Sequence, residues 1–343
     1  MKGTRRHIPA FVWLLSIAPL AALLWLIGSG LEHSLNGWYY RIVDLSGIAI
    51  IAAVSLNIIN GFTGQFSIGH AGFMLVGAYA SAGITVFAHQ AAHIPEGARS
   101  PLEFALAIVV GGLAAAAVGL LVGLPSLRLR GDYLAIATLG FGEAIRAIFI
   151  NIDAVGGASG LHNLPRYTSF VWVYLGAAGV IVVARNLALS THGRALFAIR
   201  EDEVAAQAVG VNTFRYKVLA FVIAAAWAGV AGALLAHLDM SIDPMSYGFM
   251  KSVEIVVMVV LGGLGSITGA LIAAVALTWP TELLRLVPGV SEYRMVIYPV
   301  LLILLMLLRP QGLLGRKEFS LAALFPRPSS ARPRAAREKE DAC

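Results

Sequence analysis

The chain has 343 residues, of which 58% are hydrophobic and only 13% are charged, and its mean hydropathy is +0.80. Soluble domains carry about 25% charged residues, so this composition excludes an ordinary soluble enzyme or binding module and indicates a membrane protein. The net charge of +6 does not indicate nucleic-acid binding, because the basic residues lie at the ends of apolar segments, where membrane proteins collect Lys and Arg.

In chain order, apolar segments recur at the length of a membrane-spanning helix, which is about 20 residues. The predicted fold is all-α, a polytopic transmembrane domain of about ten helices. The first segment follows three basic residues, as a signal peptide would, but it lacks a convincing small-residue cleavage site, so we expect a retained helix. The expected spans lie at about residues 11–31, 42–58, 70–88, 104–123, 132–150, 170–184, 218–238, 251–263, 266–284 and 295–308.

The distribution of basic residues predicts that both termini are cytoplasmic. Most of the 25 Lys and Arg residues fall before the first span, in the loop 185–217 or after the last span. We divide the chain into residues 1–40 (the cytoplasmic N-terminus and first helix), 41–315 (the membrane domain) and 316–343 (a basic cytoplasmic tail, expected to be disordered). The short segment 251–263 leaves open whether 251–284 is two spans or a broken, re-entrant element.

A polar, glycine-spaced run follows the second span. Its glycines permit close approaches that a Cβ atom would block, and irregular backbone at membrane depth survives only when it is buried in protein or faces a water-filled cavity. We expect a broken helix or re-entrant turn beside a translocation pathway, or a tight helix–helix contact; a cytoplasmic loop with packing glycines is the alternative. His70 has no second ligand one helical turn away, so a metal site is not expected, and a hydrogen-bonding role at a helix start is favoured. The expected pathway residues are Asn57, Asn60, Thr63, Gln65 and Ser67.

Charged residues also occur near the starts of later spans. Asp132 is predicted to cap the helix that follows it. Glu143 and Arg146 are three residues apart and share a helix face, so each neutralises the other without a ligand. Glu254 stands in the same relation to Lys251.

The loop 185–217 contains a short helical pattern. Its acidic residues cluster in the first turn, where the helix dipole favours them, Ala-rich helix formers follow, and Gly210 is a natural stop. A helix this short is not stable alone, so it requires a docking surface on the membrane domain or on a partner.

The sequence contains no energy-converting motif. There is no phosphate-binding G-x-x-x-x-G-K-[ST] loop, no H-E-x-x-H, no C-x-x-C and no G-x-S-x-G, and the single cysteine, Cys343, excludes a cysteine metal site. Few acids lie within spans, so proton or sodium coupling is poorly supported. We therefore expect no catalysis, cofactor or metal in this chain.

Four ordered runs resemble the membrane permeases of branched-chain amino-acid ABC importers, and the LivM-type subunit most of all. The resemblance covers about residues 40–312. It implies two inverted halves, a bacterial inner-membrane location and a cytoplasmic coupling helix. The runs are LNIINGFTGQFSIGHAGF at 56–73, RGDYLAIATLG at 130–140, GRALFAIREDEVAAQAVG at 193–210 and GGLGSITG at 262–269.

The resemblance also implies partners: a second, LivH-type permease, two cytoplasmic ATP-binding subunits, a periplasmic substrate-binding protein and the surrounding lipid. The cargo would be branched-chain or related small amino acids; urea or another small amide or acid is the alternative. A stand-alone secondary carrier, or a lipid-modifying enzyme, is less well supported by the sequence. The residues expected at the ATPase are Glu201, Asp202, Glu203, Gln207 and Gly210, and those expected to dock the binding protein are Arg41, Arg99 and Arg166.

Overall fold

The computed structural model describes residues 10–34, 36–92, 101–129 and 131–284. The tenth expected span and the basic tail lie outside this part. Within it the chain is helical apart from turns and one two-residue strand pair, which confirms the all-α class. The helices are α1 (Ala10–Ser34), α2 (Gly37–Asn57), α3 (His70–Ala92), α4 (Pro101–Ser126), α5 (Asp132–Ile150), α6 (Phe170–Leu189), α7 (Thr191–Glu201), α8 (Glu203–Ala208), α9 (Thr213–Asp239), α10 (Phe249–Gly262) and α11 (Ile267–Leu283).

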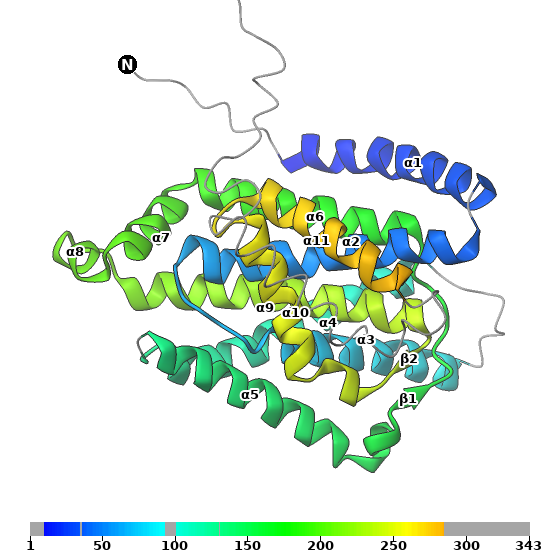
Figure 1. The fold of residues 1–343 in the computed structure, drawn as a ribbon. Helices are drawn as coiled ribbons and strands as arrows, with labels where there is room; N and C mark the ends of the chain where they lie inside the picture. Colours follow the sequence, from blue (N-terminus) through cyan, green and yellow to red (C-terminus); the bar gives the residue numbers. More distant parts are fainter. Residues whose placement is uncertain (1–9, 35, 93–100, 130, 285–343) are drawn as a thin grey trace, which may run out of the picture.

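The long helices run back and forth between two ends of the molecule (Figure 1). The short helices α7 and α8 lie at one end, here called the α8 end. The strands β1 (Leu161–His162) and β2 (Ser241–Ile242) pair antiparallel at the opposite end, here called the β end. Among the described residues, five helices are long and apolar enough to cross a membrane: α2 with its extension, α4, α5, α6 and α9.

Small residues let the central helices approach closely. A Cβ atom at Gly77 on α3 would run into the backbone of Gly229 on α9, and one at Gly232 would run into the backbone at Met74. Transmembrane helices gain most of their association energy from such close packing, because lipid is as apolar as their side chains. The helices α2, α3, α4 and α9 thus form the centre of the fold, and α2 is buried from Ser46 to its end except at Ala49.

The chain between α2 and α3 is a broken helix, one of the arrangements expected for this run. The last turn of α2 widens into the π-helical turn Ile58–Phe62, residues 64–69 are non-helical, and α3 begins at His70. His70 Nε2 lies 2.8 Å from the Ser55 hydroxyl, so this histidine has the predicted hydrogen-bonding role at a helix start. The backbone N–H groups of Ile68 and Ala71 donate to hydroxyls on α5 and α10, which attach the break to its neighbours.

The segment 249–283 is a helical hairpin. Helix α10 has 14 residues and α11 has 17, which corresponds to about 21 and 26 Å at 1.5 Å per residue. Each is shorter than the hydrocarbon core of about 30 Å. The hairpin starts and ends toward the β end, and its turn points toward the α8 end (Figure 1). Two short spans and a re-entrant element both fit these lengths and directions.

One predicted helix cap is wrong. Gly131, with φ +60°, occupies the N-cap position of α5, and Asp132 lies in the first helical turn without a capping hydrogen bond. A glycine adopts this left-handed conformation without the steric cost that an aspartate would incur. Asp132 still lies where the helix dipole favours a negative charge.

Candidate functional site

Asn57 joins the end of α2 to the turn of the α10–α11 hairpin. Its amide nitrogen donates to the Ser266 carbonyl at 3.1 Å, and its Oδ1 accepts from the Gly265 N–H at 2.9 Å. The residue is 1% exposed, so water does not compete for either bond. A buried amide with both ends bonded fixes the hairpin turn against the broken helix.

Glycines make this contact possible. A Cβ atom at Gly61 would run into Asn57 Oδ1 and into the backbone of Gly265. Gly263 and Gly265 have φ of +106° and +90°, values that other residues rarely adopt. The two glycine-rich runs, about 200 residues apart in the sequence, are therefore two sides of one junction.

The other expected pathway residues lie in the same segment and are buried. Asn60 donates to the Ser67 carbonyl at 3.4 Å and accepts from the Ser67 N–H at 3.1 Å. Thr63 donates to the Ile59 carbonyl at 2.7 Å and accepts from the Gln65 N–H at 3.3 Å. These bonds hold the shape of the break. The Ser67 hydroxyl is buried without a hydrogen-bond partner in the described part of the chain.

Arg200, near the end of α7, reaches this junction from outside. Its Nη1 donates to the Gly61 carbonyl at 3.0 Å, and its Nη2 pairs with Glu201 at 3.0 Å. The guanidinium lies 5.2 Å from the centre of the Phe197 ring, and Phe197 packs edge-on against Phe62. A Cβ atom at Gly64 or Gly265 would meet the Arg200 side chain. One arginine therefore contacts the broken helix and lies against the hairpin turn.

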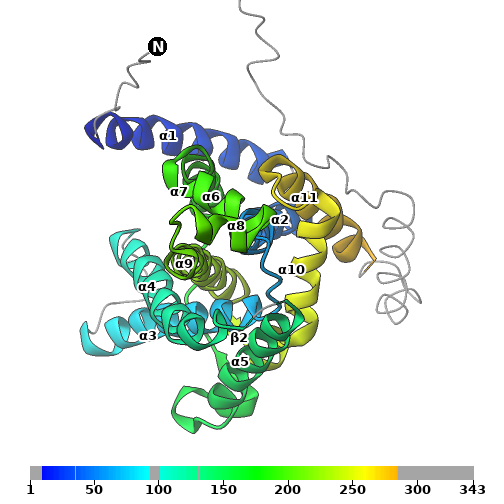
Figure 2. The ribbon, with the colours of Figure 1, turned by 90° about the vertical axis from the view of Figure 1, so that its left-hand side faces the viewer.

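The predicted short helix is present as α8, and it begins and ends as expected. Asp202 Oδ1 accepts from the Val204 and Ala205 N–H groups at 2.8 and 3.0 Å, the geometry of an N-cap. Gly210, with φ +87°, follows its last turn. Helix α7 before it was not predicted. Figure 2 looks onto this end and shows α7 and α8 over the ends of α2 and α9.

Two expected ATPase contacts of α8 bond to α9, although Gln207 stays exposed. Glu203 Oε1 lies 2.7 Å from Lys217 Nζ on α9, and Gln207 Nε2 donates to the Thr213 hydroxyl at 2.9 Å. The outward face of α8 is apolar instead, because Val204 is 67% and Val209 is 79% exposed. These inward bonds attach α8 to the domain, while its free face has the character of an uncovered contact surface.

A polar cavity of about 250 Å³ lies between α8 and the broken helix. Its walls come from the segment 63–66, from the start of α5 and from α7, α8 and α9. Arg200, Glu203 and Lys217 all line it. The charged residues that attach α7 and α8 therefore border open space rather than a packed core.

A second cleft lies between α2, α10 and α11. Its lining combines Lys251, Glu254 and Glu282 with two threonines and a set of apolar side chains. Lys251 Nζ pairs with Glu254 Oε2 at 3.0 Å, as the spacing predicts. Glu143 and Arg146 on α5 also pair as predicted, at 2.7 Å, and Arg146 additionally contacts the Met245 sulfur.

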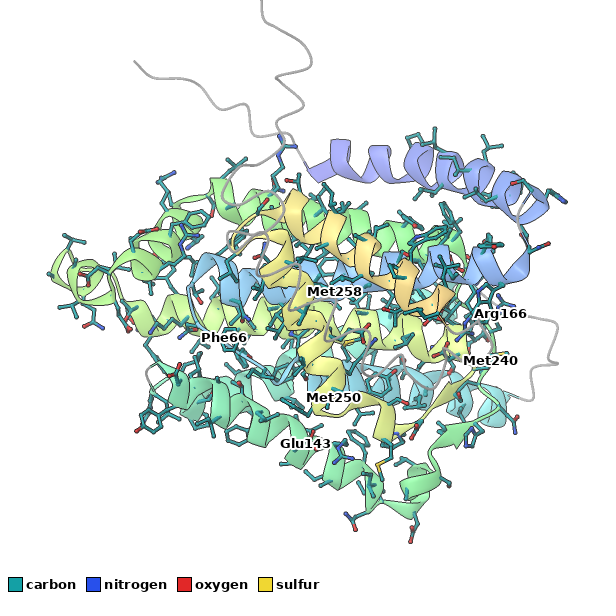
Figure 3. All side chains as sticks on the ribbon, in the orientation of Figure 1. Phe66, Glu143, Arg166, Met240, Met250 and Met258 are labelled. Atoms are coloured by element: carbon teal, nitrogen blue, oxygen red, sulfur yellow. The ribbon has the colours of Figure 1, made fainter. Side chains whose placement is uncertain are left out.

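The β end carries two of the three arginines expected to dock a binding protein. Arg41 pairs with Asp239 at 2.7 Å, and its side chain is 36% exposed. Arg166 lies at this end, near Met240 (Figure 3). Arg99 lies outside the described residues. No group of three or more His, Cys, Asp or Glu side chains that could hold a metal occurs in the described part of the chain.

Sequence reasoning missed Arg200, the apolar face of α8 and the second cleft. The contact from Arg200 to Gly61 joins residues 139 positions apart, and no local pattern signals it. The exposed face of α8 had a signal in the apolar residues Val204, Ala205, Ala208 and Val209, which lie on one side of a helix. The pair Lys251–Glu254 was identified, but not the cleft around it.

Known proteins resemble this chain over most of its length. The family model described as the permease component of branched-chain amino acid transport systems matches residues 39–306. The high-affinity branched-chain amino acid transport system permease protein LivM of Escherichia coli (strain K12) is 35% identical over 308 residues, which is 80% of this chain and 69% of that protein.

Two further relatives extend the comparison. The permease protein LivH of Salmonella typhimurium is 37% identical over 156 residues, 46% of this chain and 50% of that protein. A probable LivM permease of Methanocaldococcus jannaschii is 26% identical over 324 residues, 79% of this chain and 91% of that protein.

Proposed function

The chain belongs to the family of permease components of branched-chain amino acid transport systems, and from this premise we propose that it is the LivM-type subunit of an ATP-driven importer. It is a multi-pass protein of the bacterial inner-membrane type and a transport subunit rather than an enzyme. Together with a LivH-type permease it forms the translocation pathway. Two cytoplasmic ATPase subunits supply energy, a periplasmic binding protein delivers the amino acid, and lipid surrounds the helices.

The ATPase acts on this chain through α8. A helix of six residues is too short to be stable alone, and its inward bonds to α9 leave Val204 and Val209 uncovered. An apolar face on a short capped helix fits a cleft in a partner protein. Around this face, Glu201, Asp202 and Gly210 form a polar rim, and Glu203 and Gln207 act indirectly, by holding α8 on α9.

The contact between Arg200 and Gly61 is the single observation that carries the proposed mechanism. A push on α8 moves the end of α7, and Arg200 is bonded to the carbonyl of the π-helical turn. Through Asn57, that turn is bonded to the hairpin turn. Movement of the ATPase subunits thereby reaches two broken elements of the membrane domain, and transporters form their substrate sites at such discontinuous helices.

We assign Asn57, Asn60, Thr63, Gln65 and Ser67 to the pathway as the segment that shapes its inner part. Asn57 and Asn60 set the geometry of the break, and Thr63 and Gln65, which line the polar cavity beside it, are the groups best placed for a passing polar molecule. Weakly binding, uncharged groups suit passage, because tight binding would slow release.

The assignment of α8 to the ATPase also sets the orientation of the chain in the membrane. The α8 end and both termini are cytoplasmic, and the β end is periplasmic, as the basic residues favour. Arg41, Arg99 and Arg166 on the periplasmic side then steer acidic residues of the binding protein toward the permease, more than they hold it. Two inverted halves are consistent with this orientation, since α2 and α9 run in opposite directions (Figure 1).

Uptake into proteoliposomes tests this function. The four kinds of subunit are reconstituted together, and then again with each one omitted, and uptake of radiolabelled leucine is measured with and without ATP. We expect uptake only when all are present, with competition by valine and isoleucine and none by urea. Uptake that persists without the ATPase subunits would refute the proposal and favour a stand-alone carrier.

A further inference from the structure

The cleft between α2, α10 and α11 has a charged mouth and an apolar floor. Lys251 and Glu254 lie in the first turns of α10, and Glu282 lies in the last turn of α11, so all three are toward the β end. Deeper lining comes from Ala52 and from Met258, which is labelled in Figure 3. On the proposed orientation, the charged groups meet a molecule that arrives from the periplasm.

The charges at the mouth are complementary to a zwitterion. Lys251 and Glu254 now neutralise each other at 3.0 Å, with side chains 31% and 25% exposed. An amino acid can enter between them, with its carboxylate on Lys251 and its ammonium on Glu254. This exchange replaces one ion pair by two and leaves the net charge unchanged, so no isolated charge is created at any step.

Further acceptors surround the position of the ammonium group. The Thr278 and Thr281 hydroxyls each donate to the carbonyl four residues earlier, at 2.7 Å, and their oxygens keep the capacity to accept. Glu282 adds a buried carboxylate on the same wall. An ammonium group carries three donors and requires such a set of acceptors.

The volume of the cleft matches the head group that all amino acids share, which consists of the ammonium, Cα and carboxylate. Its volume is about 60 Å³, room for about four to six waters at 10–15 Å³ each. The ammonium, Cα and carboxylate of an amino acid have five non-hydrogen atoms. This head group would fill the volume, so the side chain of the cargo would lie outside the cleft.

We propose that this cleft is a weak binding site for the zwitterionic head group of the amino acid in transit. The proposal rests on the transport function above and adds the residues that recognise the cargo. Glu143 and Arg146 form an ion pair with the same three-residue spacing, but neither residue lines this cleft. Arg146 also contacts the Met245 sulfur. That pair therefore serves as a matched control.

The test combines loss of a charge on the ligand with loss of a charge on the protein. The permease and ATPase subunits, with this full chain and without the periplasmic binding protein, are placed in lipid nanodiscs. Ligand-observed NMR, corrected with empty nanodiscs, measures the binding of three probes. These probes are L-leucine, 3-methylbutan-1-amine (leucine without its carboxylate) and 4-methylpentanoate (leucine without its ammonium).

For the wild type we expect leucine to bind about tenfold or more tightly than either analogue, since each lost contact is a charged hydrogen bond. Lys251→Met should abolish the preference over the amine, and Glu254→Gln the preference over the acid. Lys251→Arg, which keeps the charge, and the control double variant Glu143→Gln with Arg146→Met should retain both preferences.

The proposal would be overturned if Lys251→Met and Glu254→Gln kept the wild-type preference for leucine over both analogues. It would also be overturned if the control double variant lost that preference. The same variants, reconstituted into proteoliposomes together with the binding protein, are assayed for ATP-driven leucine uptake. If the wild type takes up leucine but the variants keep both preferences, only the cleft assignment fails. If the wild type takes up no leucine, the transport function fails, and the cleft assignment fails with it.

Discussion

Replacing Arg200 by methionine should separate ATP hydrolysis from transport. Methionine keeps most of the side-chain length and the packing against Phe197, but it removes the donor to the Gly61 carbonyl at 3.0 Å. A hydrogen bond from a charged group contributes about 1.5–3 kcal/mol. The ion pair with Glu201 adds little, because the Glu201 side chain is 60% exposed. We expect the variant to fold and to lose about 2 kcal/mol of the coupling between α7 and the broken helix.

A loss of about 2 kcal/mol corresponds to about a 30-fold change in an equilibrium. In proteoliposomes, leucine uptake and phosphate release are measured together, and we expect the number of leucine molecules moved per ATP to fall at least tenfold. Arg200→Lys keeps the charge but loses the planar fork of donors, so its number of leucine molecules moved per ATP should lie between those of the wild type and Arg200→Met. Arg194→Met, an exposed position on the same helix, should match the wild type. Wild-type stoichiometry in Arg200→Met would refute the reasoning.

Three further changes test neighbouring parts of the account. Gly61→Ala places a Cβ atom against Asn57 and Gly265 and should lower the thermal unfolding midpoint. The control Gly140→Ala places its Cβ atom in open space and should leave the midpoint unchanged. Equal midpoints in the two variants would contradict a tight junction at Gly61. Asn57→Leu leaves the Gly265 N–H unpaired and should cost about 1–3 kcal/mol of folding stability, measured by denaturant unfolding; an unchanged stability would show that the two bonds do not matter. Val209→Asp changes a side chain that is 79% exposed and should leave folding intact but abolish co-purification of the ATPase; retained co-purification would remove α8 from that interface.

Features set by local sequence could be predicted, because the physics that produces them is local. Hydropathy alone located the long helices, since a lipid-facing helix needs a continuous apolar run. The position of α8 followed from the cluster of acidic residues at its start and from Gly210 at its end, whose effects depend only on adjacent backbone. The ion pairs three residues apart followed from helix geometry.

Features set by tertiary contact could not be predicted. Gly131 and Asp132 are adjacent, and only the backbone conformation decides which one caps α5. Nothing near Arg200 in the sequence indicates that it meets Gly61. The pair Lys251–Glu254 looks self-sufficient on its own helix, and it becomes a candidate site only because α2 and α11 leave a cleft beside it.

The central claim is that energy enters this chain through α8, and cross-linking in the assembled transporter tests it most directly. The only cysteine is Cys343, so a Cys343→Ser background allows one photoreactive label at Val209→Cys and, in a separate chain, at Met240→Cys on the β end. The account predicts that the label at position 209 cross-links to the ATPase subunit and that the label at position 240 does not. A label at position 209 that never reaches the ATPase, or a label at position 240 that does, would contradict it.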